Sequence, residues 1–377
     1  AKADGSTITI TEEGVYIVRG TLEDGQIIVN ASDSDKVQIV LDGVHINCET
    51  NAAIYVREAD KVFITLAENS SNTLGDGNEY TQIDDNTVDS VIFSKSNLVC
   101  NGTGSLTIEA DYKHGIVSKD DLVITGGTYK IAAADNGITA KDQIKILNGS
   151  FDIDAANSAV KAKNTDDAEL GNIYIAGGIF TIEAEQDGFH ATGSIVVDDG
   201  TITVNSGDDG FHADLDTVIH GGTILVEKSY EGLEGKRVVV NGGDITVNAS
   251  DDGANAAGSG DDEVLADEGL SVKAGGDGAD DVLQVQVLGY LGLAEQIADI
   301  AAVALVPAQT VHIRGGFPHF LHKGSSHNVF HLHYPLLLKT SFSYCLTDAN
   351  HSPSAGTPHS RQYCSQTSPK GMVFSSS

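Results

Sequence analysis

The sequence has no tryptophan, only one methionine, and no proline before residue 307. Proline cannot donate a hydrogen bond to a strand ladder, so its absence leaves residues 1–282 free to form continuous strands. The scarcity of aromatic residues argues against a flat aromatic platform for stacking a ligand. The nearest approach to a long apolar run, residues 282–307, is interrupted by Glu295, Gln296 and Asp299. We therefore predict no membrane insertion.

Cysteine is scarce as well. The four cysteines (Cys48, Cys100, Cys345 and Cys364) show neither a CxxC pair nor a His–Cys spacing typical of metal sites. This usage excludes a disulfide scaffold and leaves the redox compartment open. The chain begins at Ala1 without a charged and then apolar leader, so we interpret it as a mature form or a fragment whose targeting cannot be read directly.

Basic residues are also scarce. The formal net charge is −32, and residues 1–282 carry 51 acidic but only 17 basic side chains. Residues 283–377 carry 3 acidic and 5 basic ones, so the acid is confined to the first part of the chain. That part repels nucleic acid and anionic membrane surfaces. It can instead attract divalent cations, or polymers that such cations bridge to the protein.

Short β-branched segments, in which apolar and polar residues alternate, make up most of residues 7–66. They are bounded by Gly, Asp or Asn, which predicts strands joined by turns. No helical period competes with this pattern. Residues 68–88 are polar and rich in turn residues, and we predict a long surface loop there.

From about residue 98 the sequence repeats regularly. Successive intervals between coil starts are 22, 22, 29, 22, 22 and 21 residues, and the starts are Gly115, Gly137, Ala159, Gly188, Gly210, Gly232 and Gly253. The interval of 29 contains an insertion around residues 164–167, which we place in a loop. Each coil has a short strand after its start, a second strand ending in a Gly pair or Asx-Gly, and a third strand with alternate apolar residues.

Stacking the coils aligns residues of one kind. The residue one position after each start is apolar and the residue three positions after is small, so both face the interior. The residue between them faces outward, and this outward column holds Val117, Thr139, Lys161, His190, His212, Glu234 and Asn255. Three short strands per turn of about 22 residues predict an all-β solenoid, a single-stranded parallel β-helix, over residues 1–282.

Acidic residues recur just before the coil starts. Stacked strands lie about 4.8 Å apart, and at that distance two carboxylates repel by roughly 1 kcal/mol in water and about 3.5 kcal/mol at an effective dielectric of about 20. Ca²⁺ accepts about six to eight oxygen ligands in irregular geometry, so it would relieve this repulsion. We therefore predict a Ca²⁺ site whose candidate ligands are Asp187, Asp208, Asp209, Glu231, Glu234, Asp251 and Asp252.

Ordinary turn chemistry is the alternative for these acids. Asx side chains bond their own backbone in Asp-Asp-Gly turns, and exposed Asp also prevents edge pairing. Catalysis by β-elimination on a uronate polymer would need a cation and a Lys or Arg base. The candidate bases are Lys161, Lys228, Lys236 and Arg237, and none belongs to a repeated pattern. Glycoside hydrolysis needs two carboxylates about 5–9 Å apart, which any acidic column supplies.

Several separated blocks resemble one bacterial family; they are residues 26–29, 36–44, 52–56, 59–66, 114–122, 228–235 and 250–258. Together they are similar to the secreted carbohydrate-binding proteins named after a cellulose-binding protein of a clostridial cellulose degrader. The resemblance implies a right-handed parallel β-helix similar to polysaccharide lyases, and surface-bound Ca²⁺. It also implies affinity for cellulose and acidic pectic polymers without established catalysis. Mapped block by block, it favours the acids within residues 208–209, 230–234 and 251–252.

After residue 282 the period ends, and eight of the thirteen histidines follow. Members of the resembled family continue into further coils, which only residues 277–280 faintly resemble here. Three interpretations of this irregular tail, residues 283–377, stay open. It is an appended segment, a cap in which a helix at residues 284–306 covers the end of the solenoid, or, as we favour, a frameshifted or wrongly joined reading frame. From residue 307 on the composition is typical of disorder.

These observations predict calcium-dependent binding of a plant cell-wall polysaccharide, cellulose or acidic pectin, without catalysis. The predicted sugar contacts are Lys161, His190, His212, Tyr230 and Glu234. A secreted or bacterial cell-surface monomer is expected, with no nucleic-acid partner. A pectate-lyase-like enzyme is the first alternative, and a structural adhesin is the second.

Overall fold

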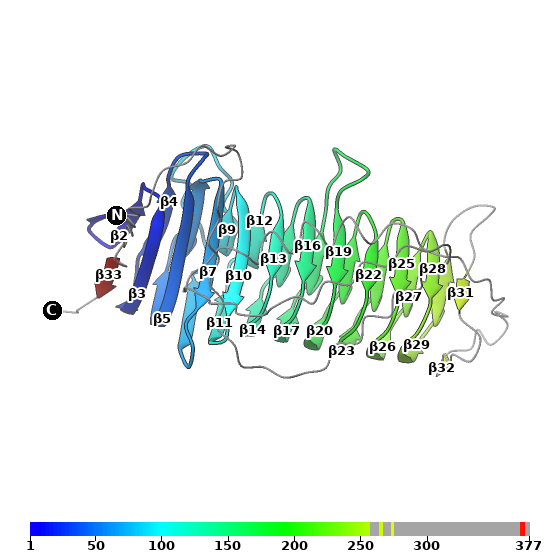
Figure 1. The fold of residues 1–377 in the computed structure, drawn as a ribbon. Helices are drawn as coiled ribbons and strands as arrows, with labels where there is room; N and C mark the ends of the chain where they lie inside the picture. Colours follow the sequence, from blue (N-terminus) through cyan, green and yellow to red (C-terminus); the bar gives the residue numbers. More distant parts are fainter. Residues whose placement is uncertain (257–263, 267–272, 275–369, 374–377) are drawn as a thin grey trace, which may run out of the picture. The chain divides into compact units, whose positions relative to one another are not determined.

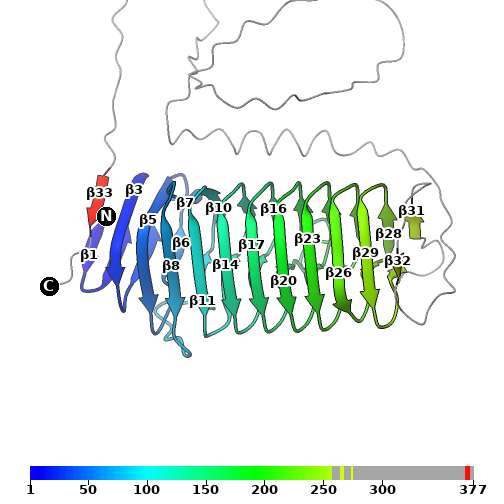
Figure 2. The same cartoon turned by 90° about the horizontal axis from the view of Figure 1, so that it is seen from below.

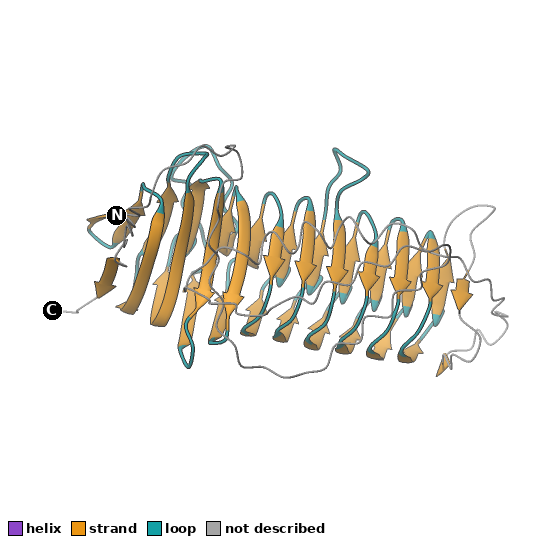
Figure 3. Cartoon of the chain, in the orientation of Figure 1, coloured by secondary structure: helices purple, strands orange, loops and turns teal. Residues whose placement is uncertain are grey.

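A computed structural model describes residues 1–256, 264–266, 273–274 and 370–373. Every regular element in these ranges is a strand, and none is a helix (Figures 1 and 3). The strands wind into a solenoid of about 11 turns with about 23 residues per turn. The predicted fold class, a right-handed single-stranded parallel β-helix, is therefore confirmed. None of the described residues forms a helix that could cross a membrane.

The first strand of each coil belongs to a 12-stranded sheet, here called sheet A. All its pairings are parallel except that of β1 with β2. Its strands, in order, are β1 (Lys2–Asp4), β2 (Thr7–Ile10), β4 (Gln26–Asn30), β6 (Ile54–Glu58), β9 (Ser90–Ser94), β12 (His114–Ser118), β15 (Ile138–Ala140), β18 (Val160–Ala162), β21 (Phe189–Ala191), β24 (Phe211–Ala213), β27 (Leu233–Gly235) and β30 (Ala254–Ala256).

The second and third strands of each coil belong to one 21-stranded sheet, here called sheet B (Figure 2). The second strands are β7 (Lys61–Leu66), β10 (Asn97–Gly102), β13 (Leu122–Ile124), β16 (Gln143–Ile146), β19 (Asn172–Ile175), β22 (Ile195–Val197), β25 (Asp216–Ile219), β28 (Arg237–Val240) and β31 (Val264–Ala266). The third strands are β8 (Ser71–Asp76), β11 (Ser105–Ala110), β14 (Thr128–Ala133), β17 (Ser150–Ala155), β20 (Ile179–Ala184), β23 (Thr201–Ser206), β26 (Thr223–Ser229), β29 (Asp244–Ala249) and β32 (Lys273–Ala274). The remaining strands are β3 (Gly14–Leu22), β5 (Lys36–Cys48) and β33 (Lys370–Val373); β5 pairs with both β7 and β8, and β33 pairs with β3.

Ladders of identical or similar side chains fill the interior, as the alternation predicts. Phe189 and Phe211 are fully buried, and their rings stack with centroids 4.8 Å apart and an interplanar angle of 10°. Phe151 and Phe180 stack in the same way in the third strands, 4.7 Å apart. Offset aromatic stacking adds to the burial of apolar surface, so each ladder fixes the register of its coils.

The coil-start glycines are required by close approach of the next coil. A Cβ atom on Gly210 would lie 2.6 Å from the carbonyl oxygen of Gly232, and one on Gly188 would lie 2.7 Å from that of Gly210. The Gly pairs of the second turn have a different cause, because residues such as Gly178 have a φ of 121° that favours glycine. Both kinds of glycine mark the repeat, for separate reasons.

The segment predicted as a long loop, residues 68–88, is only partly a loop. Residues 71–76 form β8, whose side chains at Asn72, Leu74 and Asp76 are buried. Residues 68–70 precede this strand, and residues 77–89, here called the strap, follow it and cross the outer face of sheet A. They place Val88 and Tyr80 against Tyr55, Phe93 and Val117, which belong to an apolar cluster outside the main core. Val117 therefore lies in the outward column, yet it is buried.

The other loop prediction is confirmed. Residues 163–171 connect β18 to β19, and this inserted loop projects beyond its neighbours near β19 in Figure 1. The predicted domain boundary at residue 282 and the predicted irregular tail, residues 283–377, lie outside the described ranges apart from β33.

Candidate functional site

A polar groove of about 430 Å³ lies over the C-terminal half of sheet A. It is lined by Asn157, Lys161, Gln186, Asp187, His190, Asp208, Asp209, His212, Tyr230, Glu231 and Glu234, and we call it the acidic groove. It brings together every predicted site residue except Asp251 and Asp252, which lie one coil further along. Asn157 and Gln186 were not singled out from the sequence, although they stand in the column that contains Asp208 and Tyr230.

The floor of the groove is the outward column of sheet A. Parallel pairing aligns Lys161 with His190, His190 with His212, and His212 with Glu234. The two imidazole rings stack with centroids 4.8 Å apart and an interplanar angle of 9°. The groove is therefore built from successive coils, each of which contributes one side chain to its floor.

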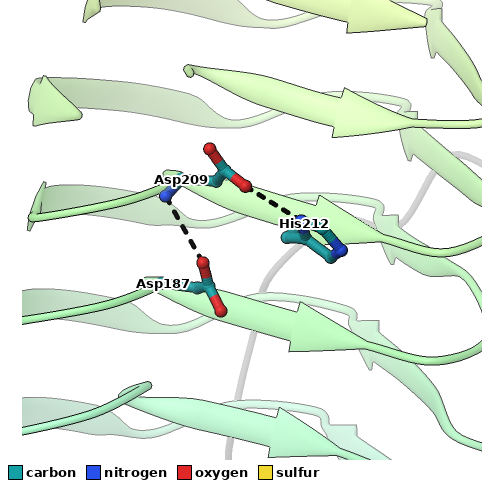
Figure 4. Close-up of side chains that lie close together, drawn as sticks. All are labelled: Asp187, Asp209 and His212. Carbon is teal, nitrogen blue, oxygen red and sulfur yellow. Dashed lines mark hydrogen bonds and ion pairs between the residues drawn. The ribbon is translucent and has the colours of Figure 1, made fainter. Parts of the chain in front are cut away.

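Asp187 and Asp209 are buried at the edge of this floor, with 6% and 5% of their surface exposed. One oxygen of each carboxylate accepts a hydrogen bond from the backbone N–H of the next coil, from Asp209 at 3.4 Å and from Glu231 at 3.3 Å respectively. Figure 4 shows the first of these contacts. Asn136 makes the same bond to Ser158 at 3.2 Å, so an amide serves this structural purpose equally well.

The second oxygen of each buried carboxylate faces a histidine. Asp209 Oδ2 lies 2.9 Å from His212 Nδ1, as Figure 4 shows. Asp187 Oδ2 lies 2.7 Å from His190 Nδ1. Glu234 also contacts His212 Nδ1, so this ring lies between two carboxylates. Burial opposes ionisation of Asp187, but the hydrogen bond and charge of His190 outweigh burial and lower the pKa of Asp187.

The hydrogen bond that His212 donates to Asp209 raises the pKa of His212 to about 9, against burial and together with the charge of Glu234. Because this pKa is raised by folding from its ordinary 6.5, the stabilisation is complete below about pH 6.5 and is lost as the pH rises through 9. In the metal-free protein we expect the His212 ring to titrate near pH 9 by NMR. Asp209→Asn should move the midpoint several tenths of a unit or more toward 6.5 while keeping the backbone hydrogen bond. A wild-type midpoint near 6.5 would contradict the ion pair.

Carboxylates crowd together at the other end of the groove. Asp209, Glu231 and Glu234 present oxygens within 4.8 Å of one another, and so do Glu231, Asp251 and Asp252. Burial, a hydrogen bond to Asp209 and neighbouring acids raise the pKa of Glu234 to about 7, although the charge of His212 opposes them. Burial and the charges of Asp209, Asp252 and Asp251 raise the pKa of Glu231. These acidic groups could hold a metal ion.

A further acidic group, Asp120, Asp121 and Asp142, lies outside the groove at the turns that follow β12 and β15. These three residues were not among the metal ligands predicted from the sequence. Their signal is the Lys-Asp pair that recurs at residues 119–120 and 141–142, one coil apart.

Lys161 is the lysine of the acidic groove. Burial lowers the pKa of its ammonium group, and the charge of Asp187 only partly opposes this. No salt bridge to Lys161 is formed within the described part of the chain. Of the other candidate bases, Lys228 and Lys236 are exposed outside the groove, and Arg237 is paired with Asp216 at 2.6 Å. The structure thus leaves Lys161 as the single sequence-predicted base that lines the groove.

Known proteins share this sequence pattern. The sequence profile of the carbohydrate-binding domain-containing protein family matches residues 4–278, almost three quarters of the chain. The chain belongs to this family. The resemblance seen in the sequence is therefore confirmed, and a polysaccharide is the class of partner that the family indicates.

One curated member of this family, from Acetivibrio thermocellus, is 38% identical over 128 residues. The alignment covers 33% of this chain and 45% of that relative, so the chain spans less than half the relative's length. A solved structure, the polysaccharide lyase-like protein from C. thermocellum as a gadolinium derivative, is similar with a TM-score of 0.52 and 28% identity. That similarity covers 72% of this chain and 92% of the solved one.

Proposed function

We propose that the acidic groove binds plant cell-wall polysaccharide, cellulose or an acidic pectic polymer, with the help of Ca²⁺. One observation carries the proposal: carboxylates from three successive coils meet at Glu231, which belongs to two of the three groups of possible metal ligands at the groove, the third being Asp187, Asp209 and His212. A cation there would join protein carboxylates to sugar hydroxyls or uronate groups. The family to which the chain belongs supports carbohydrate as the ligand.

The donor chemistry fits calcium at the Glu231 end. Glu231, Glu234, Asp251 and Asp252 offer only hard oxygen ligands, which Ca²⁺ prefers. Burial, and after it the charges of Asp209, Asp252 and Asp251, raise the pKa of Glu231, and a bound cation would relieve the repulsion among these carboxylates. Asp187 fits less well, because its two oxygens already contact the Asp209 N–H and His190. We therefore assign the predicted ligands Asp187 and Asp209 to the support of the site, with Asp209 at its margin.

The side chains that project into the groove would contact the sugar. Tyr230 is 49% exposed and directly precedes Glu231, so its ring can lie against a sugar face. His190 and His212 are oriented through Nδ1 by buried aspartates, which leaves Nε2 of each ring to face a ligand. His212 Nε2 lies 3.4 Å from the exposed side chain of Asp214. It would exchange this contact for one with the sugar.

The separation of the candidate base from the carboxylates at the Glu231 end of the groove favours binding over catalysis. β-Elimination needs a base and a cation at the same sugar. Lys161 and Glu234 are three coils apart, about 14 Å at about 4.8 Å per coil. The ammonium and the cation would therefore act on different sugars. We also propose that the protein is a monomer that is secreted or displayed on the bacterial surface.

The test is a binding assay with insoluble cellulose and with immobilised polygalacturonate, in Ca²⁺ and in EDTA. We expect binding in Ca²⁺ to fall at least tenfold in EDTA and to return when Ca²⁺ is restored, because the cation bridges protein and polymer. Absorbance of the mixture should show no unsaturated product. Binding that EDTA leaves unchanged would contradict the calcium bridge, and product formation would establish the lyase alternative.

A further inference from the structure

We propose that the acidic groove holds one acidic polysaccharide chain along the solenoid axis, with one sugar unit over each coil from Lys161 to Glu234 and a sugar carboxylate on the Lys161 ammonium. This inference rests on the proposed function and adds to it the direction of the chain, the number of sugar units and the group that recognises their charge.

The direction follows from how the groove is built. Its lining residues come in four sets, one for each of the strands β18, β21, β24 and β27 together with the turn that precedes it. Within each set the residue from sheet A forms the floor, and residues from the preceding turn, such as Gln186 and Tyr230, form one wall. A site that repeats along the axis offers equivalent contacts to a polymer laid along it.

The spacing of these contacts suits a linear polymer. The stacked rings of His190 and His212 are 4.8 Å apart, which is the rise of one coil. A sugar unit in an extended 1,4-linked polymer advances the chain by nearly the same distance. Four coils from Lys161 to Glu234 therefore match four sugar units, whereas a coiled glycan would fall out of step.

Charge differs between the two ends of the groove. Lys161 stands at one end without a salt bridge to any described residue, in a protein whose net charge is −32. Glu231 and Glu234 stand at the other end, in a group of carboxylates that could hold a cation. A partly desolvated ammonium that forms no salt bridge is a natural partner for the carboxylate of a uronate.

The strap explains why the groove begins near Lys161. Toward the N-terminus, the outward column continues through Thr139 to Val117, Phe93 and Tyr55. The last three are buried in the apolar cluster that contains Val88 of the strap. Polar floor is therefore available from about Lys161 onward, and the ammonium occupies the first charged position.

The experiment measures affinities for oligogalacturonides of two to six units by calorimetry at saturating Ca²⁺, with wild type and with Lys161→Met, which keeps the aliphatic stem. Oligomers of four or more units should bind Lys161→Met about tenfold more weakly, the loss of one charge-assisted contact. The two-unit oligomer, held at the cation end, should change less than twofold. The exposed neighbour Lys163 provides the matched control, and Lys163→Met should bind all lengths like wild type.

A second ligand isolates the charge. Methyl-esterified oligomers of the same length lack the carboxylate, so they should not distinguish Lys161→Met from wild type. An equal loss for all lengths would overturn the axial arrangement, and an equal loss for the ester would overturn the contact between Lys161 and a sugar carboxylate. Either result would leave the proposed function intact, since that function fails only if the wild type binds no glycan in Ca²⁺ or binds it equally well in EDTA.

Discussion

Phe211→Ala is expected to lower the free energy of unfolding by about 3–5 kcal/mol, the range for removing a fully buried phenylalanine. Phe211 is completely buried, and its ring stacks on Phe189 in the previous coil. Phe189 in turn meets Phe180 edge to face, with centroids 5.8 Å apart. Removal of the ring would leave a cavity that the neighbouring coils, bound on both sides by strand ladders, cannot collapse to fill. Urea denaturation followed by circular dichroism measures the change.

Two variants show whether this loss belongs to the interior ladder. Phe211→Leu should cost clearly less, because the next coil carries Leu233 in the same register. Ile179→Ala should change stability by less than about 0.5 kcal/mol, because Ile179 is 57% exposed on sheet B. Similar losses for Phe211→Ala and Ile179→Ala would contradict the assignment of inward and outward columns.

The interior could be predicted because it repeats. Each strand alternates its side chains between two faces, and a fixed interval then places like residues above one another. The assignment of Phe189, Phe211 and Leu233 to the interior needed only their common distance from a glycine. The same interval placed Lys161, His190, His212 and Glu234 in one outward column, which the structure confirms.

The orientation of the acidic column could not be predicted in the same way. An interval assigns a residue to a position in a turn, but it does not say which groups its side chain meets. Asp187 and Asp209 occupy the expected column, yet they are buried and bound to the N–H of the next coil. Asn136 at the same position was the available signal, since an amide there argues for backbone bonding rather than for metal.

The strap lies beyond the reach of periodicity for another reason. Residues 77–89 form a single insertion, so no second copy indicates where they pack. Their anchor is a contact between distant residues: Tyr55 donates a hydrogen bond to Asp84 at 2.8 Å, and Arg57 pairs with the same carboxylate at 2.9 Å. A polar segment next to an outward column that contains Tyr55, Phe93 and Val117 was the one hint that a loop covers sheet A.

Glu231→Gln is expected to lower the affinity for Ca²⁺ by about 10–100-fold. Mutation of groups that only support a metal ligand already has an effect of this size, and a ligand should matter at least as much. Glu231 is the residue common to the two carboxylate groups at this end of the groove, so its charge contributes to any ion held in either. Glutamine keeps the size of the side chain and an oxygen that can accept from Asn255 Nδ2, which lies 2.9 Å and 3.0 Å from the two carboxylate oxygens. The metal-free fold should therefore stay intact.

The protein supplies its own probe for this measurement. Tb³⁺ binds oxygen sites of the calcium type and emits when a nearby aromatic ring transfers energy to it. The chain has no tryptophan, so Tyr230, the neighbour of Glu231, is the expected donor. Competition of Ca²⁺ against Tb³⁺ emission then gives both affinities in one titration. Tyr230→Phe should dim the emission and leave the affinity unchanged, which separates the loss of the donor from the loss of the site.

Two other acids serve as controls, one exposed on sheet B and one buried at the edge of the groove. Glu183→Gln removes an exposed charge from sheet B and should leave the affinity within about twofold of wild type, because charges on exposed surfaces are screened by salt. Asp187→Asn keeps the hydrogen bond to Asp209 N–H and should also weaken Ca²⁺ binding far less than Glu231→Gln. If Glu231→Gln binds Ca²⁺ like wild type, the acids at this end of the groove are turn residues and the polymer must be held without a metal bridge. If Asp187→Asn loses as much as Glu231→Gln, the ion lies deeper in the column, against the buried carboxylates that we assign to support.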